Sequence, residues 1–402
     1  MNILFLTITR FTTIAERGIY TDLMRFFADQ DHKVCVVAPA ERRYRKPTSL
    51  VNEGQVSILN VTIPNIQKTN LLEKGLSTLL LERLFLKAIK NHFSHIRFDL
   101  VIYSTPPITF TKIIREIKER NNAKAYLLLK DIFPQNAIDL QMLKQGGLIH
   151  RFFYRKELAL YRVSDYIGCM SPANVAFLLK HNSWLDPARI EVNPNSTALL
   201  PSTLDQIPKN TIRESHQLPT DKTIFVYGGN LGKPQGISFL LQTIEACAAL
   251  SEAFFLVVGS GTEYPRMQRW FDTRKPANAR LIETMPKDDY DKLVSACDVG
   301  LIFLDPRFTI PNYPSRLLSY LENSMPVITA TDPNTDIGTI AEENGYGLKC
   351  LSGDIETMKQ HIQYCCENAE KVKGMGQKGY LFLKNNYTVQ HSYDIIMKHF
   401  RK

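Results

Sequence analysis

The sequence predicts an α/β protein of two domains, each built on a doubly wound parallel sheet. Its 402 residues are too many for one ordinary hydrophobic core. Short apolar runs alternate with amphipathic helical patterns in both halves, which is typical of parallel sheets. Residues 193–211 are rich in Pro, Asn, Ser and Thr and interrupt this alternation. We therefore expect an N-terminal domain over residues 1–200 and a C-terminal domain over residues 201–387.

The individual elements follow from the apolar periodicity of each segment. In the N-terminal half the expected strands are 2–9, 33–39, 98–105, 123–131 and 165–171, and the expected helices are 18–30, 108–121 and 172–182. In the C-terminal half the expected strands are 223–229, 253–261, 279–284, 299–305 and 325–331, and the expected helices are 237–250, 263–273, 288–298 and one that opens at 314–316. Ligands bind such sheets beyond the carboxyl ends of the strands, so a cleft between the two domains is the expected site.

The composition is that of an ordered globular protein, with 44% hydrophobic and 22% charged residues. A net charge of +9 favours an anionic partner, either nucleic acid, acidic lipid or a phosphorylated substrate. The basic residues are dispersed and no nucleic-acid-binding motif is present, so we expect no nucleic acid partner.

Seven scattered cysteines without a CxxC pair indicate neither a disulfide framework nor a zinc site. No cluster of His and Asp at ligand spacing is present, so no metal is expected. The N-terminus lacks the pattern of a signal peptide, and no uncharged run is long enough to span a bilayer. These features favour a cytoplasmic protein.

The loop after the first strand of the C-terminal half, "YGGNLGKPQG", is unusually rich in glycine. Gly228, Gly229, Gly232 and Gly236 permit close approach of the backbone and leave N–H groups free for a phosphate. The alternative is a tight strand-to-helix turn that binds nothing.

A second loop, "VVGSGTE", carries Gly259 and Gly261 and is weaker support by itself. This loop does not match GxGxxG, since residue 264 is Tyr, and the first segment "ITRFTTIAERG" does not match it either, which disfavours a dinucleotide dehydrogenase. The chain has no GxxxxGK[ST], which disfavours a P-loop NTPase.

Arg316 lies in the first turn of the helix that follows "PNYPS". Since the helix dipole disfavours a cation there, we expect Arg316 to face an anion, and its forked guanidinium suits a diphosphate. Ser315 could cap the helix or bond a phosphate oxygen. The alternative for Arg316 is an ion pair with Asp305 or another surface carboxylate.

Six segments, in order along nearly the whole chain, carry a family resemblance: "STPPIT", "LKDIFPQNAIDL", "YGGNLGKPQGI", "GSGTE", "MPKDDYDKLVSACDVGLIFL" and "PSRLLSYLENSMPVITATD". With them the chain resembles the GT-B glycosyltransferases of glycosyltransferase family 4. It is most similar to the bacterial branch that builds capsule and O-antigen repeats, which includes N-acetylfucosaminyltransferase-like enzymes. The resemblance implies two Rossmann-like domains, with the final helix 388–402 packed back on the first.

The resemblance implies that the C-terminal domain binds a nucleotide-sugar, with UDP as the expected nucleotide. The implied donor residues are Gly228, Gly229, Asn230, Gly232 and Lys233 near the phosphates, Gly259 and Gly261 in the second loop, Thr284, Met285 and Pro286 near the base, and Ser315, Arg316 and Ser319 on the helix. On the acceptor side it implies Arg17, Gly18, Ser104, Thr105, Lys130 and the catalytic Asp131.

The chain departs from the family pattern at two places. Many relatives have two glutamates at the positions aligned with Pro311 and Ser319, and basic residues at those aligned with Asn230 and Gln235. The sugar contacts therefore cannot be carried over, and the charge that faces the phosphates would rest on Arg316 and Lys233.

The resemblance implies a retaining transfer that needs no metal or other cofactor. No second carboxylate for a covalent intermediate is evident, so we favour departure of the nucleotide from the face that the acceptor attacks. Arg316 would stabilise the leaving diphosphate, and Asp131 would stabilise the anomeric carbon or orient the acceptor. The alternative for Asp131 is a helix N-cap or an ion pair with Lys130.

The implied acceptor is an undecaprenyl-diphosphate-linked saccharide at the inner face of the plasma membrane. The helical run 70–93, which includes Lys74, and the basic stretch 41–47 could rest on anionic lipid. The alternative is a core helix beside a solvated basic loop. Two other functions stay open, a non-catalytic scaffold of a polysaccharide assembly complex and a nucleotide-sugar 2-epimerase.

Overall fold

The structure is a computed structural model that describes residues 1–66, 71–199 and 207–400. The side chains of residues 71–76, 78 and 79 are also outside the description. The chain divides into two compact units, one of Met1–Ala198 with Val389–Lys402 and one of Leu199–Thr388. Of the helices in the described part, none is long and apolar enough to cross a membrane.

The N-terminal unit is built on an eight-stranded sheet in the order β3-β4-β2-β1-β5-β6-β7-β8. Only the β3–β4 pair is antiparallel. The strands are β1 (Asn2–Leu6), β2 (Lys33–Glu41), β3 (Ser49–Glu53), β4 (Val56–Ile63), β5 (Leu100–Ser104), β6 (Lys124–Leu129), β7 (Tyr166–Cys169) and β8 (Ile190–Val192). The helices are α1 (Ile19–Asp29), α2 (Leu71–His92), α3 (Thr111–Asn121), α4 (Gln135–Asp139), α5 (Leu148–Val163), α6 (Pro172–His181) and α15 (Val389–Met397), with 3-10 turns at Arg42–Tyr44 and Pro187–Arg189.

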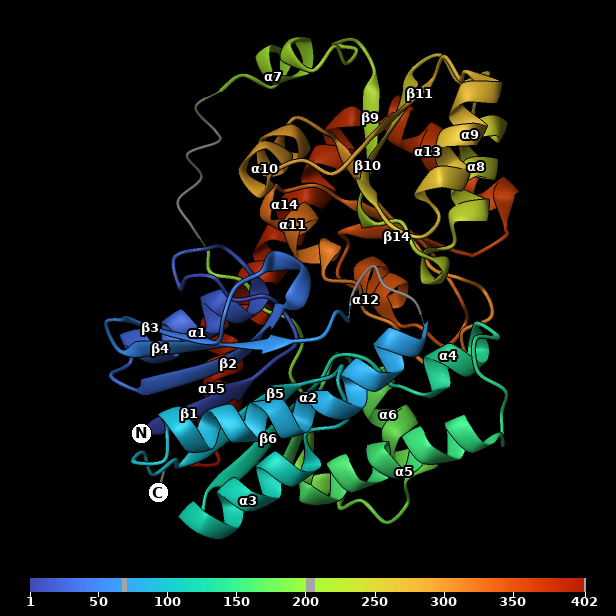
Figure 1. The fold of residues 1–402 in the computed structure, drawn as a ribbon. Helices are drawn as coiled ribbons and strands as arrows, with labels where there is room; N and C mark the ends of the chain where they lie inside the picture. Colours follow the sequence, from blue (N-terminus) through green and yellow to red (C-terminus); the bar gives the residue numbers. More distant parts are fainter. Residues whose placement is uncertain (67–70, 200–206, 401–402) are drawn as a thin grey trace. The chain divides into compact units, whose positions relative to one another are not determined.

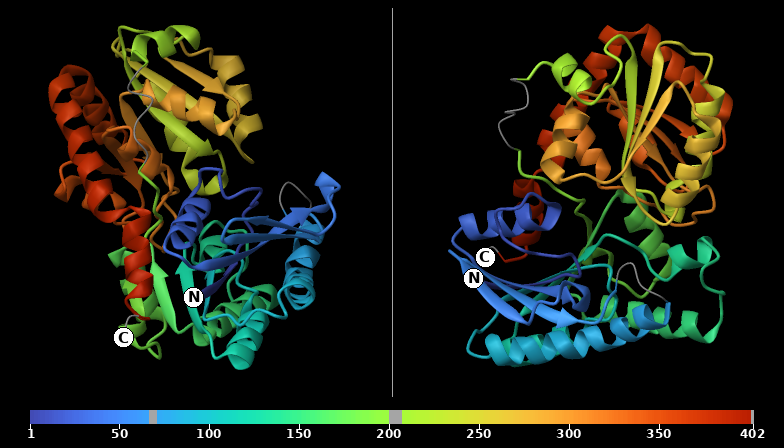
Figure 2. Two further views of the ribbon diagram at one scale, coloured as in Figure 1. Left: turned by 90° about the vertical axis from the view of Figure 1, so that its left-hand side faces the viewer. Right: turned by 45° about the horizontal axis from the view of Figure 1, so that its top comes forward.

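Both faces of this sheet are buried along its central strands, because successive side chains of a strand point to opposite faces. Ile3 and Phe5 of β1 and Val34 and Val36 of β2 pack with Phe27 of α1 in one core cluster. Residues of α15 join the same cluster, so α1 and α15 cover one face of the sheet. Helices α2 and α3 cover the other face (Figures 1 and 2).

The C-terminal unit is built on a parallel six-stranded sheet in the order β11-β10-β9-β12-β13-β14. The strands are β9 (Thr223–Asn230), β10 (Ala253–Ser260), β11 (Ala279–Ile282), β12 (Val299–Phe303), β13 (Val327–Thr331) and β14 (Gly347–Leu351). The helices are α7 (Lys209–Ser215), α8 (Ile237–Ala246), α9 (Tyr264–Arg274), α10 (Lys287–Ser295), α11 (Arg316–Glu322), α12 (Ile337–Glu343), α13 (Ile355–Glu367) and α14 (Ala369–Asn386), with a 3-10 turn at Lys233–Gln235.

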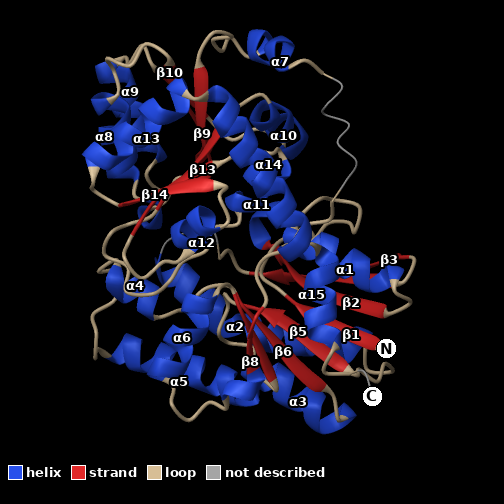
Figure 3. Ribbon diagram, turned by 180° about the vertical axis from the view of Figure 1, so that it is seen from behind, coloured by secondary structure: helices blue, strands red, loops and turns tan. Residues whose placement is uncertain are grey.

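The two faces of this sheet are again covered by different helices. Phe225 of β9 and Phe255 of β10 pack with α8 and α13 in one cluster. On the other face, Gly300 of β12 approaches the Tyr320 ring of α11, and Gly228 approaches Tyr290 of α10. Figure 3 shows the strands in red between these helices.

The structure adds elements that the sequence patterns did not predict. The hairpin of β3 and β4, strands β8 and β14, and helices α12, α13 and α14 are among them. All residues of β3 lie on the exposed side of an edge pair or are only partly buried, so this strand lacks the apolar run by which the others were found.

Candidate functional site

The predicted donor residues gather at the carboxyl edge of the C-terminal sheet. Strands β11, β10, β9 and β12 are neighbours and parallel, so the loops that follow them meet at one edge. Residues 228–230 end β9, residue 259 lies at the end of β10, residues 284–286 follow β11, and residue 315 precedes α11. The topology thus brings together residues that are far apart in the sequence.

Arg316 is the first residue of α11 and is half-buried at this edge. Its Nη2 donates a hydrogen bond to Oε1 of Gln235 at 2.5 Å. Its guanidinium carbon lies 4.2 Å from the centroid of the Tyr227 ring, which is a cation–π distance. Its Nη1 is shielded from solvent and has no hydrogen-bond partner. A shielded donor without an acceptor is costly, so Arg316 presents an unmet donor at this edge.

The tyrosines around Arg316 were not among the predicted site residues. The Tyr320 hydroxyl accepts a hydrogen bond from the Gly228 N–H at 3.0 Å. A Cβ at Gly228 would lie 1.9 Å from the Tyr290 hydroxyl, so the glycine admits this ring. Burial raises the pKa of Tyr227, Tyr290 and Tyr320 above the ordinary range. These hydroxyls therefore stay neutral and do not neutralise the guanidinium.

The alternative partner for Arg316 is occupied elsewhere. Asp305 accepts hydrogen bonds from Nε and Nη2 of Arg307 at 2.8 and 2.7 Å. The structure therefore excludes the Asp305–Arg316 ion pair. It also excludes a capping role for Ser315, which is exposed and makes no side-chain cap hydrogen bond.

The glycines of the two loops serve different purposes. A Cβ at Gly259 would lie 1.9 Å from the Gly229 carbonyl oxygen, and one at Gly261 would lie 2.3 Å from the Leu231 carbonyl oxygen. These two glycines therefore let the two loops pack against each other. Gly229 has φ +109°, and a Cβ at this position would meet nothing within 4 Å. Glycine is therefore needed here for the backbone conformation and not for lack of space.

The other donor candidates line the same edge. Asn230 and Lys233 are exposed, and Gly232 is buried between them. Thr284 and Pro286 are exposed, Met285 is half-buried, and Ser319 is half-buried one helical turn after Arg316. Gln235, at a position where family members often have a basic residue, instead accepts the hydrogen bond from Arg316.

On the N-terminal unit, Thr105 ties the loop after β5 to the loop after β6. Its Oγ1 accepts hydrogen bonds from the N–H groups of Lys130 and Asp131 at 3.0 and 3.1 Å. Oδ1 of Asp131 accepts a hydrogen bond from Asn136 at 2.8 Å. Burial raises the pKa of Asp131 to about 6, although the Asn136 bond acts in the opposite direction.

Neither alternative for Asp131 matches the geometry. Nζ of Lys130 donates to the Asn193 carbonyl oxygen at 3.0 Å, and the contacts described for Asp131 include no ion pair with Lys130. Pro134 occupies the N-cap of α4. Burial lowers the pKa of Lys130 to about 7, so this amine carries at most a partial charge near neutral pH.

Three further acceptor-side candidates lie at the same edge of the N-terminal sheet. Ser104 ends β5, and its side chain bonds the hydroxyl of Tyr20, which also lies near Asp131. Gly18 immediately precedes α1 and donates its N–H to Asp22 at 3.3 Å. Arg17 is half-buried beside it. Tyr20 is a site neighbour that the sequence patterns missed, because it looks like a core residue of an amphipathic helix.

The expected interfacial helix is a core helix over its described part. Leu81, Phe85, Leu86 and Ile89 of α2 are buried, as the alternative expects, and Arg83, Lys87 and Lys90 are exposed. Lys74 lies outside the described side chains. The basic stretch 41–47 is mostly exposed.

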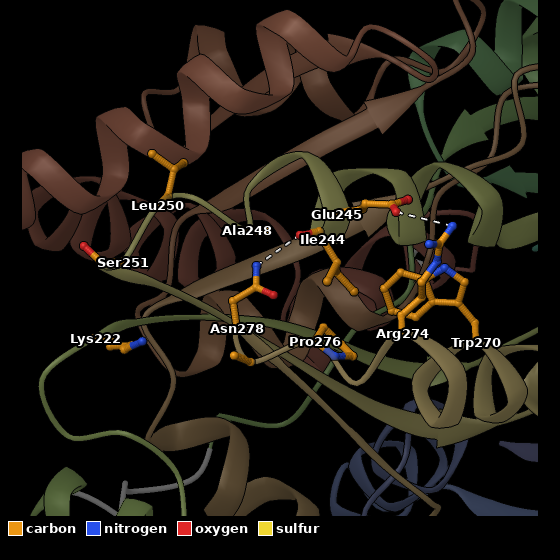
Figure 4. Close-up of a pocket in the computed structure, with 11 residues that line it drawn as sticks. Lys222, Ile244, Glu245, Ala248, Leu250, Ser251, Trp270, Arg274, Pro276 and Asn278 are labelled. Atoms are coloured by element: carbon orange, nitrogen blue, oxygen red, sulfur yellow. Dashed lines mark hydrogen bonds and ion pairs between the residues drawn. The ribbon is translucent and has the colours of Figure 1, made fainter.

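One pocket of about 240 Å³ lies at the opposite, amino edge of the C-terminal sheet. Lys222 and Asn278 directly precede β9 and β11, Ser251 lies two residues before β10, and all three line it, with Trp270 and an Arg274–Glu245 ion pair (Figure 4). It is remote from the candidate donor residues. Among the residues that the structure describes, no group of three His, Cys, Asp or Glu side chains could hold a metal ion.

Comparison by sequence identifies relatives. Residues 208–382 match the family "Glycosyl transferases group 1". Over 307 residues, 76% of this chain and 74% of the relative, the chain is 23% identical to a Pseudomonas aeruginosa protein named "Probable glycosyltransferase WbjE".

Comparison by structure identifies similar folds. Sucrose-phosphate synthase of Thermosynechococcus elongatus superposes with a TM-score of 0.78 at 15% identity, over 100% of this chain and 98% of that one. HepE of Anabaena in complex with UDP-glucose gives 0.69 at 13% identity, over 100% and 99%. WaaG, a glycosyltransferase involved in lipopolysaccharide biosynthesis, gives 0.65 at 13% identity, over 98% and 99%. The predicted GT-B fold, with two Rossmann-like parallel-sheet domains, is confirmed.

Proposed function

Since residues 208–382 match the family "Glycosyl transferases group 1", we propose that this chain is a retaining glycosyltransferase that uses a UDP-sugar. The acceptor is a lipid-linked saccharide, and the product is an intermediate of a bacterial surface polysaccharide. The similarity to HepE, which binds UDP-glucose, and to WaaG, which acts in lipopolysaccharide biosynthesis, supports this proposal. The donor sugar is N-acetylated or deoxygenated, as in the branch that the sequence resembles.

The observation that carries the proposal is the state of Arg316. The guanidinium is half-buried, stacked on Tyr227 and held by the neutral Gln235. Its Nη1 lacks an acceptor, and Asp305 is bound to Arg307. A pre-positioned cation without a counter-ion suits a bidentate phosphate ligand.

The proposed chemistry breaks the bond between the anomeric carbon and the diphosphate oxygen. A bond from the acceptor hydroxyl oxygen forms on the same face of the sugar, and the hydroxyl proton passes to the leaving phosphate oxygen. Arg316 stabilises the charge that develops on the diphosphate, with N–H groups around the open Gly229 assisting. In this proposal no metal is needed, because the arginine and these N–H groups supply the positive potential.

Asp131 takes the role of stabilising positive charge at the anomeric carbon or orienting the acceptor hydroxyl. Its pKa of about 6 leaves the carboxyl mostly ionised at pH 7, as that role requires. Residues Arg17, Gly18, Ser104, Thr105 and Lys130 form the proposed acceptor side, and Thr284, Met285 and Pro286 contact the base.

One observation favours a second candidate, a non-catalytic scaffold. By the family resemblance, Pro311 and Ser319 stand where many relatives have glutamates, so the sugar contacts of those glutamates cannot be carried over to this chain.

The discriminating experiment incubates the purified protein with a panel of UDP-, GDP- and ADP-sugars and undecaprenyl-diphosphate-linked saccharides. Product is detected by mass spectrometry, with and without EDTA. Sugar transfer from one UDP-sugar, unchanged by EDTA and lost in Arg316→Ala, is the expected result. Nucleotide binding without transfer or donor hydrolysis across the panel would support the scaffold.

A further inference from the structure

The segment 142–156, which joins α4 to the first half of α5, combines exposed apolar and basic side chains. Met142, Leu148, Ile149 and Phe152 are 56%, 86%, 61% and 40% exposed. The basic residues of the segment are Lys144, Arg151, Arg155 and Lys156, and it contains no Asp or Glu. We call the exposed side chains of Met142, Lys144, Leu148, Ile149, Arg151, Phe152 and Arg155 the α5 face.

Helical spacing separates this face from the core side of α5. Leu148, Arg151, Phe152 and Arg155 follow the spacing i, i+3, i+4, i+7 and therefore form one stripe, and all four are exposed. The opposite stripe contains Glu157 and Leu160, which are buried against the N-terminal unit. Helix α5 lies along the outer side of that unit in both views (Figures 1 and 3).

The apolar exposure at Leu148 and Ile149 is larger than at the other adjacent exposed pair of the described chain, Leu50 and Val51, which are 37% and 40% exposed. Leu351 and Leu381 are also more than half exposed, but each stands without an apolar neighbour of that exposure nearby in the sequence. Leu148 and Ile149 are adjacent and share their helix with Phe152. Single exposed apolar residues are ordinary, whereas a contiguous group marks an interaction surface.

We propose that the α5 face binds the surface of an anionic lipid bilayer. Its apolar side chains enter the boundary between headgroups and acyl chains, and its arginines and Lys144 remain at the level of the phosphates. The absence of acidic residues over the whole segment complements a negative surface. A nucleic acid ligand would leave Leu148 and Ile149 exposed, so charge and apolarity together favour lipid.

The chain order places this face next to the candidate acceptor side. The loop that carries Asp131 continues through α4 directly into the segment. Bilayer contact here brings a lipid-linked acceptor to that loop. The delivery of a lipid-linked acceptor rests on the proposed function. The binding of the α5 face to a bilayer does not, because affinity for lipid is measured without sugar transfer.

The test measures co-sedimentation of the purified protein with vesicles of phosphatidylglycerol and with vesicles of phosphatidylcholine. We expect binding to phosphatidylglycerol vesicles and little to phosphatidylcholine. Leu148→Ser with Ile149→Ser should weaken binding to phosphatidylglycerol vesicles about tenfold. Arg151→Glu with Arg155→Glu should weaken it by more than tenfold, since each basic residue near such a surface contributes roughly fivefold.

Matched controls separate the α5 face from general surface effects. Leu381→Ser and Lys373→Glu change exposed residues of α14 and should leave binding unchanged. Arg42→Glu with Lys46→Glu tests the other basic surface, at 41–47, and should have a small effect. Melting curves confirm that each variant is folded, which the exposure of the altered residues favours.

Three outcomes would overturn the proposal. The first is that the wild type binds no vesicles at low salt. The second is that the α5 variants bind as the wild type does, or that only the Arg42 and Lys46 changes abolish binding. The third is that the α5 variants change the oligomeric state of the protein without lipid, which would make the face a contact between copies of the chain.

Discussion

Arg316 and Asp131 carry opposite charges at similar positions in the two sheets, but different kinds of neighbours contact them. Each is half-buried at the carboxyl edge of a parallel sheet, Arg316 in the C-terminal unit and Asp131 in the N-terminal unit. Arg316 is braced by an aromatic ring and a neutral amide, and one of its nitrogens lacks an acceptor. Asp131 receives a hydrogen bond from Asn136, and its main chain is fixed by Thr105.

This difference separates a residue that binds the donor and its leaving group from a residue that acts only in the chemical step. A guanidinium with an unmet donor gains an acceptor when a phosphate arrives, so Arg316 contributes affinity for the donor in addition to stabilising the leaving diphosphate. A carboxyl whose pKa is raised by burial to about 6 is held as a charge at some cost, which is typical of groups that act on a reacting centre. Substitution of Asp131 should therefore lower mainly the rate of sugar transfer, whereas substitution of Arg316 should also lower the affinity for UDP.

The largest effect expected from the N-terminal unit is on turnover. Asp131→Asn keeps the shape and loses the charge, so we predict a fall in the rate of sugar transfer by roughly a hundredfold. The affinity for UDP should stay within twofold of the wild type, because Asp131 does not bind the nucleotide. Initial rates and calorimetric UDP titrations measure the two quantities. Near-normal turnover would remove Asp131 from the mechanism.

A smaller effect is expected when Arg316 is given an internal counter-ion. Gln235→Glu places a carboxylate at the oxygen that now accepts the Nη2 hydrogen bond. It should weaken UDP binding roughly tenfold, because the pair must be broken or the phosphate repelled. Gln235→Leu removes the acceptor without adding charge and should change UDP affinity much less. Equal affinities for both variants would show that the charge state of Arg316 is irrelevant to the nucleotide.

The smallest effect concerns pH. The pKa of Asp131 is about 6 in the folded chain and about 3.9 in an unfolded one. Between these values the folded state binds more protons, so this group lowers stability as pH rises from about 4 to 6 and has a constant effect above that. Asp131→Asn removes this pH-dependent loss of stability. Its melting temperature relative to the wild type should rise by roughly 2 °C between pH 4 and pH 7. A difference that is constant with pH would contradict a raised pKa.

The sequence predicted the two-unit α/β architecture well, because parallel strands buried on both faces are continuous apolar runs. Arg316 was found because it lies in the first turn of a helix at the edge where ligands bind, and Asp131 was implied by the family resemblance. Which partner each takes could not be predicted. Asp305 was a reasonable partner for Arg316, yet Arg307 lies two residues from it and binds it.

The surroundings of Arg316 and the burial of helices α2 and α5 depend on tertiary packing. Tyr227, Tyr290 and Tyr320 look like core residues in the sequence, and only packing places them around Arg316. The apolar pattern of α2 does not distinguish a core helix from an interfacial one, and in its described part Leu81, Phe85, Leu86 and Ile89 are buried. The same pattern concealed the exposed stripe of α5, because burial depends on which neighbours the fold supplies.

Calorimetric titration of UDP into the wild type, Arg316→Ala and Arg307→Ala tests the central claim most directly. Arg307 is the matched control, since it is an arginine of the same loop region already paired with Asp305. The account predicts that the Kd for UDP rises at least tenfold in Arg316→Ala, as expected for loss of a charge-assisted bidentate contact, and changes by less than twofold in Arg307→Ala. Wild-type affinity in Arg316→Ala, or no UDP binding by the wild type, would contradict it.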